Sequence, residues 1–314
     1  MGYLALGRMF AALLVFAAIF SGCDFFGGRG TAPNVDDTQP PEQSVYDPEY
    51  PVEVAGVEIS FRPARVISLA PSLTEKIYDL GHGGRLVGIS EHQGDFPPSL
   101  VHVPSYGMAM LPDIEGILSR EPHLVFAVSE LPVWAMNALD AANIPLVVLP
   151  SYAHNMDELA EIYRALAHAL SGRTSGELIW QRLMETIDGR IDEIAAESMA
   201  NGLYAVYLRS PDFTVATGDT LEGQLIERLG FVNIAASQTD WSLGSEFAAS
   251  PEGAALIAGV DVIFLDENYV SAESLSQSSI WQGHNALIVN IDSSVFERQT
   301  LRLLGQLEVM AMAV

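Results

Sequence analysis

The sequence of 314 residues contains one cysteine, Cys23, and one lysine, Lys76. A single cysteine excludes an intrachain disulfide bond. Basic residues are scarce as a class, since 15 arginines and lysines stand against 40 aspartates and glutamates and give a net charge of −25. Nucleic acids and anionic lipid headgroups bind basic surfaces, so both are poor candidates for a partner. The hydrophobic share of 49% still allows a substantial core in one or two domains.

The signatures of common enzymes are missing as well. The sequence has no Gly-x-Ser-x-Gly nucleophile elbow, no phosphate-binding P-loop and no dinucleotide-binding fingerprint after the first expected strand. It has no His-x-x-x-His pair of the kind that binds catalytic zinc. The seven histidines are dispersed along the chain: His82, His92, His102, His123, His154, His168 and His284. We therefore predict that the protein is not an enzyme.

The N-terminal sequence has the pattern of a bacterial export signal. Arg8 precedes an apolar run at residues 9–20 that is short for a membrane span, and Phe20-Ser21-Gly22-Cys23 follows. This tetrapeptide resembles the bacterial lipoprotein box, although Phe20 replaces the usual leucine. The resemblance implies a signal peptide at residues 1–22, lipidation of Cys23, and a location on the outer face of the cytoplasmic membrane. An ordinary cleaved signal peptide and an uncleaved anchor are the alternatives.

The rest of the chain is organised as two similar stretches. Residues 23–50 are rich in Gly, Pro and Asp and predict a flexible acidic tether. Residues 51–171, which open with a hairpin, and residues 201–314 each alternate short apolar strands with helices, the last helix being expected at 297–313. Such alternation is typical of a parallel sheet covered on both faces. We therefore expect an α/β fold with two Rossmann-like lobes whose sheets are mainly parallel.

One long amphipathic stretch, residues 174–199, lies between the expected lobes. Its apolar residues recur at helical spacing, and Thr174 with Glu177 forms a capping-box pattern at its start. Gly189 weakens the middle of the helix by about 1 kcal/mol relative to alanine. We expect residues 172–200 to form a single helix that bridges the lobes.

Each expected lobe contains a short helix that starts with a glutamate and precedes a buried strand. Glu115 follows Pro112 and Asp113, and Glu252 follows Ser250 and Pro251. A carboxylate in the first turn of a helix is favoured by the helix dipole, and this alone can explain both residues. The repetition nevertheless suggests that the two lobes are counterparts.

Several segments, in order from about residue 50 to the C-terminus, resemble one family. They include RVISLAPSLTE, RLVGIS, DFPP, PDIEGILSREPHLVFA, FTVATGDTLEGQLIERLGFVNIA and VDVIFL. These segments are similar to those of the helix-bridged solute-binding proteins of ABC importers for cobalamin, ferric siderophores and haem. The resemblance implies two α/β lobes joined by one long helix and no cofactor beyond the bound metal chelate. It further implies delivery of that chelate to a permease dimer with a cytoplasmic ATPase.

The resemblance also implies roles for individual residues. Glu115 and Glu252 match the family's docking glutamates, which are expected to meet arginines of the permease, and Glu246 is a rival for the second position. The ligand is expected between the lobes, and the residues expected to contact it are Tyr106 and Trp241 through aromatic faces, Arg209 through a carboxylate or catecholate, and His92. Each of the four also has an ordinary structural explanation.

Two other functions are compatible with the same architecture. A receptor for free zinc or manganese would need three or four His and carboxylate ligands converging from both lobes, and we identify no such set in the sequence. A sensory or adhesive lipoprotein would keep the fold without transport, and the presence of Glu115 and Glu252 argues mildly against it.

Overall fold

The structure is a computed structural model, which describes residues 47–91, 97–209, 214–238, 250–281 and 283–314. The chain divides between Val45 and Tyr46 into two units, and the described residues belong to the second. That unit opens with the predicted hairpin, in which β1 (Val52–Val54) pairs antiparallel with β2 (Val57–Ile59). Both turn residues, Ala55 and Gly56, have positive φ, which a tight two-residue hairpin turn requires.

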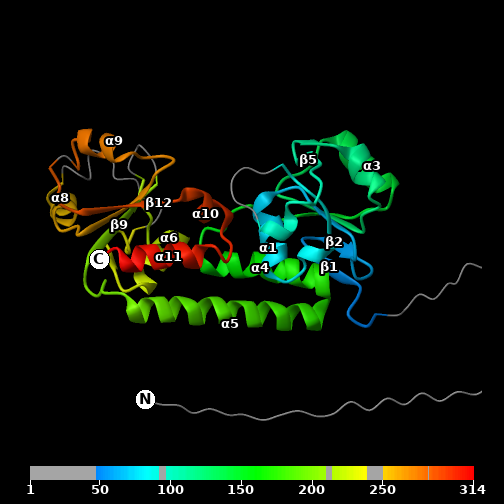
Figure 1. Ribbon diagram of the computed structural model, residues 1–314, viewed down its shortest axis with the longest axis horizontal. Helices are drawn as coiled ribbons and strands as arrows, with labels where there is room; N and C mark the ends of the chain where they lie inside the picture. Colours follow the sequence, from blue (N-terminus) through cyan, green and yellow to red (C-terminus); the bar gives the residue numbers. More distant parts are fainter. Residues whose placement is uncertain (1–46, 92–96, 210–213, 239–249, 282) are drawn as a thin grey trace, which may run out of the picture. The chain divides into compact units, whose positions relative to one another are not determined.

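The first lobe is built on a parallel sheet of order β4-β3-β7-β8 (Figure 1). Its central strands β3 and β7 are buried along their whole length, which fits a sheet with helices on both faces. The strands are β3 (Val66–Ser68), β4 (Leu86–Ile89), β7 (Leu124–Ala127) and β8 (Leu146–Val148). They are connected through α1 (Pro71–Asp79), α2 (Ile114–Ser119) and α3 (Val133–Ala141), and a small hairpin of β5 (Gly107–Met108) and β6 (Leu111–Pro112) precedes α2.

The second lobe repeats this arrangement. Its parallel sheet has the order β10-β9-β11-β12, so the first strand of each lobe again lies between the second and the third. The strands are β9 (Tyr204–Leu208), β10 (Val232–Asn233), β11 (Val262–Asp266) and β12 (Leu287–Ile291). The described connecting helices are α6 (Leu221–Arg228), α8 (Pro251–Ala258) and α9 (Ala272–Gln277). The prediction of two parallel-sheet α/β regions is confirmed.

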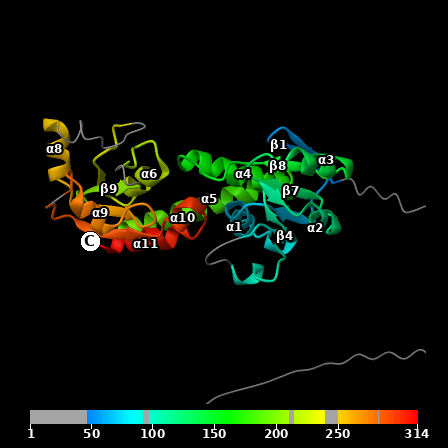
Figure 2. The ribbon, with the colours of Figure 1, turned by 90° about the horizontal axis from the view of Figure 1, so that it is seen from above.

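In each lobe a further helix follows the fourth strand. These are α4 (Met156–Ser171) in the first and α10 (Ser293–Arg298) in the second. The long helix α5 (Arg173–Glu197) comes between the lobes in the chain and packs against α4, α6 and the C-terminal helix α11 (Leu303–Met312) (Figures 1 and 2). One continuous apolar cluster includes Leu73 of α1, Ile191 of α5 and Leu225 of α6.

The predicted capping box at the start of α5 is wrong. Gly172 is the N-cap residue and has no side chain to offer, so Thr174 falls inside the helix. The free backbone N–H groups of Thr174 and Ser175 instead donate to the carboxylate of Glu49, at 2.7 and 3.3 Å. Glu177 pairs with Arg164 at 2.9 Å. A glutamate that precedes the helix by 125 residues therefore stabilises its positive end.

The single C-terminal helix expected at 297–313 is also wrong, because two helices occupy this region. Gln299 has a left-handed backbone conformation with a φ of 52°, and it ends α10 before α11 begins. Its buried side-chain amide makes two hydrogen bonds to the backbone of Ala153, at 2.6 and 2.8 Å. A distant contact that satisfies both ends of the amide thus stabilises an unfavourable local conformation.

The turn between α10 and α11 packs on α1 through a buried polar cluster, which we call the joint. It comprises Glu75, Lys76 and Asp79 of α1 with Arg298, the last residue of α10, and Thr300 of the turn. Arg298 donates to Glu75 at 2.6 Å, and Thr300 donates to the same carboxylate at 3.2 Å. The backbone N–H of Leu301 donates to Asp79 at 3.0 Å. These contacts connect the first lobe to the second.

Lys76, which is fully buried, should make the stability of the protein depend on pH. Burial lowers the pKa of Lys76 from 10.5 to about 7, although Asp79 and Glu75 oppose the shift. Between these two values the unfolded chain binds a proton that the folded chain does not, so the free energy of unfolding should rise with pH. The slope is at most about 1.4 kcal/mol per pH unit. The free energy of unfolding of Lys76→Met, measured with denaturant from pH 7 to 10, should lack this rise with pH. The same slope in Lys76→Met as in the unchanged protein would contradict the lowered pKa of Lys76.

Candidate functional site

The two expected docking glutamates occupy equivalent places in the two lobes. Glu115 is the second residue of α2, and Glu252 is the second residue of α8. In both helices the N-cap side chain, Asp113 or Ser250, accepts from the backbone N–H of a glycine three residues on, at 3.0 Å. Both glutamates are exposed and form no hydrogen bond or ion pair with another described residue. Two rigidly held carboxylates are therefore presented to solvent.

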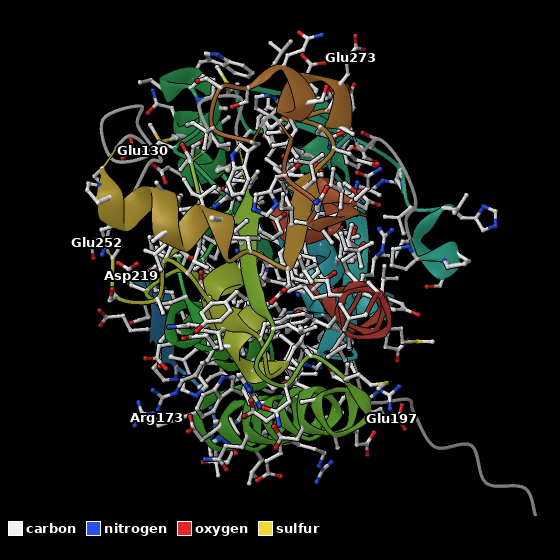
Figure 3. All side chains as sticks on the ribbon, turned by 90° about the vertical axis from the view of Figure 1, so that its left-hand side faces the viewer. Glu130, Arg173, Glu197, Asp219, Glu252 and Glu273 are labelled. Carbon is white, nitrogen blue, oxygen red and sulfur yellow. The ribbon has the colours of Figure 1, made fainter. Side chains whose placement is uncertain are left out.

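The second lobe carries another exposed glutamate at the same helical position. Glu273 is the second residue of α9, whose N-cap Ser271 also accepts from the backbone three residues on. Glu252 and Glu273 nevertheless lie on different parts of the lobe surface (Figure 3). Any helix-dipole stabilisation is common to both residues, so Glu273 is a matched reference for Glu252.

A second group of polar side chains gathers where β9 ends. Arg209, the residue after β9, forms an ion pair with Glu222 of α6 at 3.4 Å. Tyr152, which follows β8 in the first lobe, donates its hydroxyl to the same carboxylate oxygen at 2.7 Å. The guanidinium of Arg209 stacks over the Tyr152 ring, 4.6 Å from its centroid. Side chains of both lobes therefore meet at Glu222, and we call these three residues the Glu222 cluster.

Burial and charge set the protonation of this cluster. Burial is the largest influence on Arg209 and lowers the pKa of its guanidinium, but the Glu222 carboxylate together with Tyr152 and Tyr207 outweighs burial and raises this pKa overall. Burial, followed by the Glu222 charge, raises the pKa of Tyr152 well above its usual value, so its hydroxyl stays a donor. Burial also raises the pKa of the nearby Asp266 to about 6, because the stabilising hydrogen bonds and the Arg209 charge compensate only partly.

Of the three residues of the Glu222 cluster, Arg209 alone was expected at the ligand. Glu222 precedes Leu225, Ile226 and Leu229 at the spacing of one helix face, and its side chain is 1% exposed. A glutamate that continues an apolar stripe is a signal for a buried carboxylate, and it was available in the sequence. Tyr152 has no such periodic signal because it lies in the connection before α4.

Of the other residues expected at the ligand, Tyr106 is the one that the structure describes, and it lies in the core of the first lobe and not in the Glu222 cluster. Tyr106 is 8% exposed and packs in the core of the first lobe, where its hydroxyl accepts from Arg120. A Cβ atom added at Gly88 or Gly116 would lie only 2.5 or 2.6 Å from its ring, so the ring is tightly enclosed. Little of the surface of the Tyr106 side chain is therefore accessible to a ligand. His92, Trp241 and the docking rival Glu246 lie outside the described residues, as does Cys23.

A comparison with known protein families identifies the family to which the chain belongs. Residues 66–290 match the family described as periplasmic binding protein. The chain belongs to the periplasmic binding protein family. Members of this family bind solutes, in keeping with the expectation of a protein that is not an enzyme.

Individual members of the periplasmic binding protein family resemble the chain along much of its length. An uncharacterised ABC transporter substrate-binding lipoprotein of Bacillus subtilis is 21% identical, over 98% of this chain and 96% of that protein. A vitamin B12-binding protein of Pectobacterium atrosepticum is 28% identical over 56% of this chain and 64% of its own length, which is less than two thirds. A possible iron-binding, periplasmic solute-binding protein of Staphylococcus epidermidis has a similar structure, with a TM-score of 0.64, 21% identity and coverage of 81% and 99%.

Two features are absent from the described residues. Among the described residues, no three His, Cys, Asp or Glu side chains gather in a way that could hold a metal ion. The helices in the same part of the chain include none with the length and apolar character needed to cross a membrane.

Proposed function

We propose that the protein is the extracytoplasmic substrate-binding component of an ABC importer and delivers its ligand to a permease dimer with a cytoplasmic ATPase. The observation that carries this proposal is the repeated lobe, with a glutamate at the same helical position in each copy that is exposed and has no partner among the described residues. A permease built from two like subunits presents two like surfaces. Glu115 and Glu252 on a rigid body would fix the orientation of docking through complementary charge.

The proposed ligand is a metal chelate, namely a corrinoid, a ferric siderophore or haem, held between the two lobes. The vitamin B12-binding and possible iron-binding relatives support this class of ligand. Of the residues expected to contact it, Arg209 lies in a cluster that joins both lobes, which favours a role at the ligand. Tyr106, Trp241 and His92 stay predictions.

We also propose anchoring through lipidated Cys23, as the name of the Bacillus relative suggests. Replacing Cys23 with serine should then shift the protein from the membrane fraction to the soluble fraction.

A titration of tryptophan fluorescence tests the choice of ligand class. The chain without residues 1–23 would be titrated with cyanocobalamin, haem and ferric siderophores, and in parallel with Zn²⁺ and Mn²⁺. Saturable quenching by at least one chelate, with no response to either free ion, is the expected result. A response to a free ion alone would favour the receptor for zinc or manganese.

A further inference from the structure

The carboxyl ends of the sheet strands carry a strongly one-sided charge. In open α/β sheets ligands bind outside these ends. We considered the last residue of each of the eight strands in the two parallel sheets and the three residues that follow it. The acidic residues among them are Glu91, Glu130, Asp266, Glu267 and Asp292, and the one basic residue is Arg209. The edge that would face a ligand is therefore acidic.

The internal segments outside the described residues, namely 92–96, 210–213, 239–249 and 282, contain no lysine or arginine in the sequence. Most of the described basic side chains away from this edge have other partners, as when Arg298 pairs with Glu75 and Arg228 with Asp188. Arg173 and Arg182, whose side chains have none among the described residues, lie on α5. The candidate site is therefore poor in basic residues, as is the chain as a whole.

Arg209 is not free to receive an anion. Its guanidinium is paired with Glu222 and stacked on Tyr152, and Glu222 is almost fully buried. An anionic ligand that paired with Arg209 would leave this buried carboxylate without its counter-charge, which is costly. The Glu222 cluster as a whole is electrically neutral, and the acidic residues around it are in excess.

The same region has two buried polar atoms without a hydrogen-bond partner among the described residues, namely the second carboxylate oxygen of Glu222 and the hydroxyl of Tyr207. Neither atom carries a positive charge, so neither offers a partner to an anionic ligand.

We infer that the ligand is a neutral or positively charged chelate, and that the site rejects chelates with free carboxylate or catecholate groups. The inference rests on the proposed function, since it narrows the ligand of the same site. A corrinoid with its neutral amides, or a cationic hydroxamate complex, brings no net negative charge to the acidic edge. The propionates of haem and the triple negative charge of a ferric tris-catecholate would meet an acidic edge.

Equilibrium dialysis of the chain without residues 1–23 against four probes tests this selectivity. Cyanocobalamin and ferrioxamine B represent the accepted charge class, and haem and ferric enterobactin the rejected class. At least one of the first two should bind about tenfold or more tightly than both anionic chelates. Tight binding of an anionic chelate alone would overturn the inference and leave the proposed function intact. No binding of any of the four would count against the proposed function as well.

A single substitution tests the part played by Glu222. Glu222→Gln keeps the size of the side chain but removes the negative charge that compensates Arg209. The affinity for haem, relative to the better of cyanocobalamin and ferrioxamine B, should therefore rise about tenfold. Glu227→Gln, which removes the same charge from an exposed position of α6, is the matched control and should change the ratio less than about twofold. A purely structural effect of Glu222→Gln would weaken all probes alike. An unchanged ratio in a folded variant would overturn the inference.

Discussion

Replacing Glu115 and Glu252 together with alanine should abolish import while leaving the Kd for the chelate unchanged. Both carboxylates are exposed at the second position of their helices and have no partner among the described residues, so their removal should not disturb the fold. Close charge pairs across an interface commonly contribute a factor of ten or more in affinity. We therefore expect each single substitution to weaken permease binding about tenfold, and the pair about a hundredfold.

The control for this prediction is Glu273→Ala, which removes an exposed glutamate from the same helical position in α9. Uptake of labelled chelate and binding of the chain to permease vesicles would be measured for all variants. Glu273→Ala should behave like the unchanged protein in both assays. The docking role would be wrong if the double variant transported normally, or if it lost chelate affinity and kept permease binding.

Glu75→Gln should lower the free energy of unfolding by about 3–5 kcal/mol. Glu75 is 2% exposed and receives hydrogen bonds from Arg298 and Thr300, so the substitution removes the negative charge that faces the Arg298 guanidinium in the joint. The effect is large because the Arg298 side chain, which is only 12% exposed, recovers little hydration in exchange. Denaturant unfolding, with comparison of the midpoint and the m-value, measures the change.

The matched control for the joint is Glu193→Gln. Glu193 pairs with Arg190 at 2.7 Å, nearly the same distance as the pair of Glu75 and Arg298, but its side chain is 67% exposed. Exposed ion pairs contribute little because water replaces the lost partner. A loss of stability for Glu193→Gln as large as for Glu75→Gln would show that burial of the joint is not the cause.

Patterns that are local in sequence predicted most of the secondary structure. The hairpin at the start, the helix at 251–258 and the strand at 287–291 follow from alternation, helix caps and apolar runs. The long helix was recognisable because its apolar spacing continues for about four turns. The repetition of Glu115 and Glu252 likewise reflected a real equivalence of position, because the two lobes share one strand order.

The errors occurred where a distant side chain decides the local structure. The cap of α5 comes from Glu49, and the break before α11 depends on the bonds between Gln299 and Ala153, 146 residues away. No window of neighbouring residues contains this information. The enclosure of Tyr106 is likewise not visible in its neighbours, since it results from Gly88 and Gly116 on two other elements, and its role at the ligand stays a prediction.

The Glu222 cluster was only partly accessible to sequence reasoning. Arg209 was placed by its position after a strand, which is a topological argument. The fact that its charge is already compensated depends on a buried glutamate of α6 and a tyrosine of the other lobe. This compensation reverses the simplest interpretation of an arginine at a ligand site, which is recognition of an anion.

The most direct test of the proposed function is native mass spectrometry of the chain without residues 1–23, mixed with cyanocobalamin or ferrioxamine B. We predict one added chelate per chain, at micromolar or lower concentration of the chelate, and retention of the complex in the variant that lacks Glu115 and Glu252. A spectrum of the free chain alone at saturating concentrations of both chelates, with an adduct of Zn²⁺ or Mn²⁺ instead, would contradict the proposed function.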